Sequence, residues 1–93
     1  MMDINRSVEE AKIRDISLLD VRTPEEYRHG HIPGAINIPL NTTSKVQLDP
    51  EKEYFAYCHS GRRSELASRI LNERGFHVEN IGGIDDWVKE IEN

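Results

Sequence analysis

The chain has 93 residues, of which 37% are hydrophobic and 31% charged, which suits one small globular domain and excludes collagen-like or disordered chains. The formal net charge of -5 disfavours binding to nucleic acids and to anionic membranes. The single cysteine, Cys58, excludes an internal disulfide and a cysteine-rich metal site. No apolar run approaches the roughly 18 residues that span a membrane, and residues 1–17 lack a signal-peptide pattern, so we expect a cytoplasmic protein.

The first half of the chain alternates helix and strand signals. The residues SVEE, with Ser7 as the N-cap, predict a helix that starts with a capping box. The nearly continuous apolar run at 16–21 predicts a strand covered on both faces. The residues TPEE, with Thr23 as the N-cap, predict a second helix at once, and a short strand is expected at 35–38. Residues 41–52 are polar and predict turns.

The second half repeats this alternation. The aromatic run at 53–58 predicts a strand, and helical spacing follows until Gly75, which sits where a helix C′ glycine belongs. A last strand is expected at 77–81. A C-terminal helix over 82–93 would place four apolar residues on one face, namely Ile84, Trp87, Val88 and Ile91. Strands separated by helices predict an α/β fold with a parallel sheet.

Cys58 is expected at the carboxyl end of its strand, where open parallel sheets bind ligands. The next residues, HSGRR, lead into a helix whose first N–H groups favour negative charge. Gly61 allows the positive φ of a tight loop, and Arg62 and Arg63 add cationic charge. Such settings lower a thiol pKa to about 3.5–7.5. A buried structural cysteine is the competing interpretation, because free cysteines are usually buried.

Three motifs in order resemble the single-domain rhodanese family of thiosulfate sulfurtransferases. They are LLDVRTPEEYRHGHIPGAINIPL, then YCHSGRRS, and finally GGIDDW, and together they cover nearly the whole chain. The resemblance implies one rhodanese-like domain over residues 1–93. It also implies a sheet of about five parallel strands with helices on both faces, and transfer of sulfane sulfur by double displacement.

This resemblance implies that Cys58 is a nucleophile that carries a persulfide. The donor would be thiosulfate or a persulfide, the acceptor cyanide or a thiol, and no cofactor is expected. Asp20 and Arg22 would support the pocket, although an ion pair that braces the end of the first strand is the favoured interpretation. Substrate binding is expected from the loop residues His59, Ser60, Gly61, Arg62, Arg63 and Ser64. The sequence leaves open which of the two arginines faces the pocket.

Two alternatives remain open. Phosphatases and arsenate reductases with a similar fold place five residues between cysteine and arginine, whereas four separate Cys58 from Arg63 and the next position is Ser64. The second alternative is a sulfur-relay or interaction domain that works with a partner protein. A metal site is not expected, because His29, His31 and His59 do not have zinc-ligand spacing.

Overall fold

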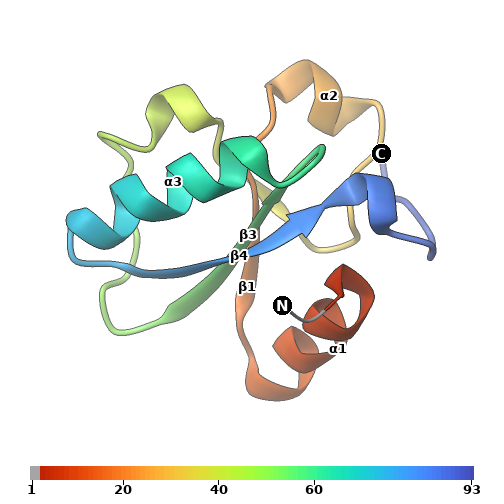
Figure 1. Ribbon diagram of the computed structural model, residues 1–93, viewed down its shortest axis with the longest axis horizontal. Helices are drawn as coiled ribbons and strands as arrows, with labels where there is room; N and C mark the ends of the chain where they lie inside the picture. The colour runs from red at the N-terminus through yellow and green to blue at the C-terminus, as the bar shows by residue number, and fades with distance from the viewer. Residues whose placement is uncertain (1–2) are drawn as a thin grey trace.

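Four parallel strands form one sheet in the computed structural model, which describes residues 3–93 (Figure 1). Their order across the sheet is β2-β1-β3-β4. The bounds are Ser17–Asp20 for β1, Ile36–Asn37 for β2, Glu53–Cys58 for β3 and His77–Gly83 for β4. The predicted parallel α/β architecture is confirmed, with one strand fewer than the resemblance implies.

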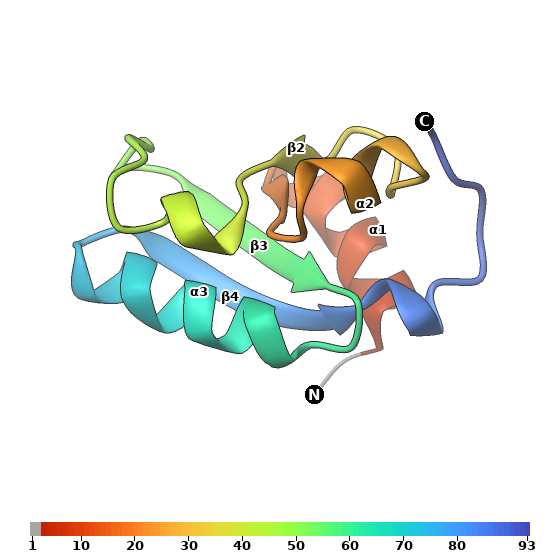
Figure 2. The same ribbon diagram turned by 90° about the horizontal axis from the view of Figure 1, so that it is seen from above.

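Helices cover both faces of the sheet, as predicted (Figure 2). Helix α1 (Ile4–Arg14) packs on one face and α3 (Arg62–Glu73) on the other. The short helix α2 (Pro24–Arg28) follows β1. Two 3-10 turns, η1 (Leu40–Thr42) and η2 (Ile84–Asp86), complete the secondary structure.

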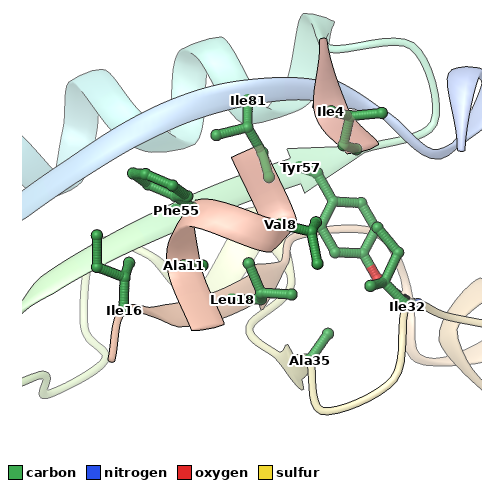
Figure 3. Packing of buried hydrophobic residues seen from close by; sticks show 10 residues of the cluster. All are labelled: Ile4, Val8, Ala11, Ile16, Leu18, Ile32, Ala35, Phe55, Tyr57 and Ile81. Atoms are coloured by element: carbon green, nitrogen blue, oxygen red, sulfur yellow. Dashed lines mark hydrogen bonds between the residues drawn. The ribbon is translucent and has the colours of Figure 1, made fainter. Parts of the chain in front are cut away.

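Strand side chains alternate between the two faces, so each face has its own hydrophobic core. Leu18 and Phe55 pack against α1, whereas Leu19 and Ala56 pack on the α3 side. Figure 3 shows the α1 core, in which apolar side chains of α1 interlock with those of the sheet and the ring of Tyr57 lies near Ile32. The α3 core contains Leu19, Val21, Tyr54, Ala56, Cys58, Ala67, Leu71, Phe76 and Val78.

Helix starts show one correct and one wrong prediction. The TPEE capping box is present: the hydroxyl of Thr23 accepts from the N–H of Glu26, whose carboxylate accepts from the N–H of Thr23. The predicted N-cap at Ser7 is wrong, because α1 begins at Ile4 with Asp3 as its cap. Ser7 is 2% exposed and shares the buried face of the helix with Val8. The apolar stripe therefore extends the helix one turn further back.

The predicted C-terminal helix is also wrong. Only η2 forms there, and Trp87 leaves it with an extended backbone. The chain then runs across to residue His31, and Glu92 pairs with it in an antiparallel bridge. Val88 is 81% exposed, so the apolar face expected for a helix is not buried. A helix this short is marginal without burial of its apolar face. The extended form is favoured instead, because it allows the backbone hydrogen bonds between Glu92 and His31 and the packing of Trp87 on the α1 core.

Candidate active site

Cys58 is the last residue of β3, one of the two central strands, as the sequence predicted. Its side chain points to the α3 face and is 1% exposed. Because β1 and β4 flank β3, loops from three neighbouring segments meet at this carboxyl edge of the sheet. The sulfur atom is therefore enclosed at this edge, where residues of the following loop and of the first turn of α3 contact it.

Backbone N–H groups of that loop point at the sulfur. Gly61 has a φ of +99°, which turns its N–H back toward Cys58 Sγ at 3.0 Å. The N–H of Ser64, in the first turn of α3, lies 3.4 Å from the same atom. Because these N–H groups have no partner inside the helix, they are free to stabilise negative charge on sulfur.

The pKa of the Cys58 thiol results from opposing effects. Burial raises it, but hydrogen bonds from Ser64, Gly61 and Ser60 outweigh burial and bring the pKa below its ordinary value. The direction is the one that the sequence predicted. The leading favourable cause is the loop's hydrogen bonds, whereas the sequence argument also relied on the two arginines.

Asn80 of β4 holds the loop in place. Its amide oxygen accepts from the hydroxyl of Ser64 at 2.7 Å, and its amide nitrogen donates to the carbonyl of Gly61 at 3.1 Å. The Ser64 oxygen is also 3.5 Å from Cys58 Sγ, but a hydroxyl has one proton and Asn80 is the nearer acceptor. The backbone N–H groups are therefore the main donors to the sulfur.

The glycine pair at the end of β4 permits close packing against the loop. A Cβ on Gly83 would lie 2.2 Å from the carbonyl oxygen of His59, so only glycine fits there. From the sequence, Gly83 is included only as part of the GGIDDW motif, and Asn80 is not selected. Neither could be recognised without knowing that β4 lies directly beside the Cys58 loop.

The two arginines of the loop have different surroundings. Arg62 is exposed, whereas Arg63 is half-buried and forms a double hydrogen bond to the carboxylate of Glu26, with N–O distances of 2.7 and 3.0 Å. The negative charge of Cys58 contributes to raising the pKa of Arg63, after the hydrogen bond to Glu26. The sequence predicted Glu26 only as part of a helix cap, and its contact with Arg63 adds a second role.

Asp20 and Arg22 form a buried ion pair at the end of β1, with an N–O distance of 2.7 Å. The hydroxyl of Tyr57 donates to Asp20 and accepts from the N–H of Ile32, and Arg22 also donates to the carbonyl of Gly30. Burial and the nearby Asp20 raise the pKa of Tyr57, so this hydroxyl stays protonated. Tyr57 belongs to the α1 core whereas Cys58 belongs to the α3 core, so the pair braces the strand end from the opposite face.

His59 and His31, two of the histidines considered as metal ligands, have different surroundings. His59 is exposed and pairs with Asp85 at 3.0 Å. His31 is buried, stacks on Tyr27 and contacts Glu92. Within residues 3–93 no group of three or more His, Cys, Asp or Glu side chains is arranged to hold a metal ion. None of the helices in this range is long and apolar enough to cross a membrane.

A thiol lies at the carboxyl end of a parallel strand, and backbone N–H groups of the following loop point at its sulfur. This arrangement is the one expected for the rhodanese-like fold. Residues 4–90 match the Rhodanese-like domain family, and the chain belongs to this family. The family prediction is therefore confirmed, and relatives of this chain are sulfurtransferases.

Three relatives show the range of this similarity. The thiosulfate sulfurtransferase PspE of Escherichia coli is 45% identical over 73 residues, which cover 73% of this chain and 70% of PspE. The sulfur carrier protein YrkF of Bacillus subtilis, whose assignment is provisional, is 41% identical over 83% of this chain but only 44% of its own length. A solved structure described as a rhodanese with anions from E. coli has a TM-score of 0.73 and 39% identity, over 83% of this chain and 96% of that one.

Proposed function

We propose that this protein transfers sulfane sulfur from a donor such as thiosulfate to cyanide or a thiol, through a persulfide on Cys58. The observation that carries the proposal is the pair of N–H groups, from Gly61 and Ser64, that point at the sulfur of Cys58. They favour the thiolate, which is the nucleophilic form of cysteine. The name of PspE supports thiosulfate as a donor for this family.

The donor step is a displacement at sulfur. The Cys58 thiolate attacks the outer sulfur of thiosulfate, the S–S bond of the donor breaks, and sulfite leaves with the electron pair. The charges balance, because a thiolate and a dianion give a persulfide anion and sulfite. In the second step cyanide attacks the outer sulfur, forms thiocyanate and restores the thiolate, which is a covalent two-step mechanism.

The loop supplies the stabilisation that both steps need. The N–H groups of residues 59–64 would hold the negative outer sulfur of the persulfide in the way that an oxyanion hole holds developing charge. Arg63 would attract the anionic donor, since the negative charge of Cys58 is among the causes that raise the pKa of Arg63. With one cysteine in the chain, the persulfide sulfur must pass to an external acceptor. Asp20 and Arg22 would act indirectly, by holding the strand end.

A sulfur-relay role is the second candidate. The similarity to a protein named as a sulfur carrier favours it. In that case a partner protein would supply or receive the sulfur, and the same Cys58 persulfide would form.

Intact mass spectrometry separates the possibilities. We expect incubation with thiosulfate to add the mass of one sulfur atom at Cys58, and cyanide to remove it as thiocyanate. Hydrolysis of an aryl phosphate without any persulfide would contradict the proposal and favour the phosphatase alternative. A persulfide that forms only from a partner desulfurase would favour the relay role.

A further inference from the structure

The pair between Glu26 and Arg63 brings an acidic side chain into the neighbourhood of the thiol. Its two short N–O contacts, 2.7 and 3.0 Å, join both carboxylate oxygens to both terminal guanidinium nitrogens. The two side chains are 34% and 36% exposed, so donors in solution can reach them. The hydrogen bond from Arg63 lowers the pKa of Glu26 to about 2, so Glu26 is ionised at neutral pH. Arg63 is therefore paired with a negative charge at neutral pH.

A groove of about 450 Å³ lies against Arg63, between the turn Val21–Pro24 and the segment Pro39–Asn41. Its walls include the apolar side chains of Val21, Pro24, Pro39 and Leu40. Val21 and Leu40 also pack in the hydrophobic core that contains Cys58. The groove thus runs along the α3 side of the carboxyl edge, where it offers an apolar surface next to a neutralised charge pair.

We propose that Glu26 determines the donor preference of this site, by disfavouring doubly charged inorganic donors relative to a singly charged donor that carries an apolar group. This inference rests on the proposed sulfur transfer and specifies its donor. The carboxylate of Glu26 repels an anionic donor and so offsets part of the attraction of Arg63, and this repulsion grows with the charge of the donor. An apolar group on the donor is not affected by this repulsion, and its burial in the groove is favourable.

Benzene thiosulfonate is a suitable probe for the second class of donor. The Cys58 thiolate attacks its outer sulfur, the S–S bond breaks, and benzenesulfinate leaves with the electron pair. A thiolate and a monoanion give a persulfide anion and a monoanionic leaving group, so no oxidant or reductant is needed. The product on the protein is the same persulfide that thiosulfate gives, which allows the two donors to be compared with one acceptor.

The test compares the wild type with Glu26→Gln and Glu25→Gln. Glutamine at position 26 keeps the capping box, which accepts either Glu or Gln at this place, and removes only the charge. Glu25 is exposed on the same helix, so its change to glutamine is a matched control for net charge. The value of kcat/KM is measured for thiosulfate and for benzene thiosulfonate, with cyanide as acceptor, at low and high salt. Thermal unfolding verifies that each variant is folded.

We expect Glu26→Gln to raise kcat/KM about tenfold for thiosulfate and about threefold for benzene thiosulfonate at low salt, because the repulsion scales with donor charge. The ratio of kcat/KM for thiosulfate to kcat/KM for benzene thiosulfonate should therefore rise in Glu26→Gln. At high salt this ratio should return toward that of the wild type. In Glu25→Gln the ratio should stay unchanged. An equal loss for both donors would overturn the inference and make Glu26 a purely structural support of Arg63. An equal ratio change in Glu25→Gln would also overturn it. A wild type that forms no persulfide with either donor would instead contradict the proposed function, and this inference with it.

Discussion

Two ion pairs flank the end of the central strands, and they differ in burial. Asp20 and Arg22 are 0% and 7% exposed as side chains, and their further hydrogen bonds go to Tyr57 and Gly30. Glu26 and Arg63 are about one-third exposed, and Arg63, in the first turn of α3 after the Cys58 loop, lines the groove. The first pair is enclosed by protein, whereas the second is partly open to solvent.

This difference in exposure predicts that the inner pair supports the fold, whereas the outer pair contributes little to stability. A buried charge that loses its partner is left without solvation, so the inner pair is needed for stability. Exposed pairs contribute little to stability, so the outer pair can change without unfolding the protein. Substitutions at the outer pair, where we propose that donor preference is set, should therefore leave the strand ends in place, because the inner pair holds them.

The largest effect should come from the loss of the Cys58 sulfur. We expect Cys58→Ser to reduce sulfur transfer to the uncatalysed background, because a hydroxyl cannot carry sulfane sulfur. Both ion pairs should remain, so urea unfolding should show a nearly unchanged midpoint. The thiocyanate assay provides the measurement. Residual transfer in this variant would show that another group carries the sulfur.

The next largest effect tests the inner pair. We expect Arg22→Met to lower the free energy of unfolding by about 3–4 kcal/mol, because Asp20 would remain buried without its cation. The same substitution at the outer pair, Arg63→Met, should cost less than about 1 kcal/mol. Urea denaturation of both variants measures the difference. Equal losses would contradict the distinction between the two pairs.

How far the sequence predicts this arrangement depends on the range of the interactions. The position of Cys58 and the positive φ of Gly61 follow from local patterns, namely a strand, a glycine and a helix start. The capping box of Thr23 is also local, and its prediction is correct. The position of the loop and its tight turn at Gly61 can therefore be predicted from neighbouring residues.

Contacts between distant segments cannot be predicted in this way. Asn80 reaches Ser64 from another strand, and Glu26 reaches Arg63 across 37 positions of the chain. The C-terminal segment fails for the same reason: its apolar spacing suggests a helix, but the bridge between Glu92 and His31 keeps it extended. Local patterns predict where the thiol and its loop lie, whereas tertiary packing decides which distant residues contact them.

A smaller effect concerns the outer pair in catalysis. We expect Arg63→Met to lower kcat/KM for thiosulfate about tenfold and to affect the reaction of the persulfide with cyanide less, because the donor has twice the charge of cyanide. Stopped-flow measurement of the two half-reactions separates these steps, and the effect on the donor step should shrink with added salt. Equal effects on both steps would indicate that Arg63 mainly holds the loop.

The smallest effect concerns the pH dependence of stability. The pKa of Glu26 is lowered from 4.5 to about 2 in the folded protein, chiefly by the hydrogen bond from Arg63. A carboxylate with a lowered folded pKa adds stability that is complete above the unfolded pKa and is lost as pH falls through the folded one. Because the pair is one-third exposed, we expect its contribution to be only about 0.5–1 kcal/mol.

Glu26→Gln should therefore be less stable than the wild type by that amount at pH 6, and the difference should vanish as the pH falls from 4.5 toward 2. Urea unfolding at several pH values measures it, with Glu25→Gln as the control. A difference that persists at pH 2 would mean that the charge of Glu26 is not its cause. Since protonation of Glu26 lies so far below neutrality, acidification within the range in which most proteins work cannot release Arg63. The donor preference proposed for the outer pair should then be independent of pH within that range.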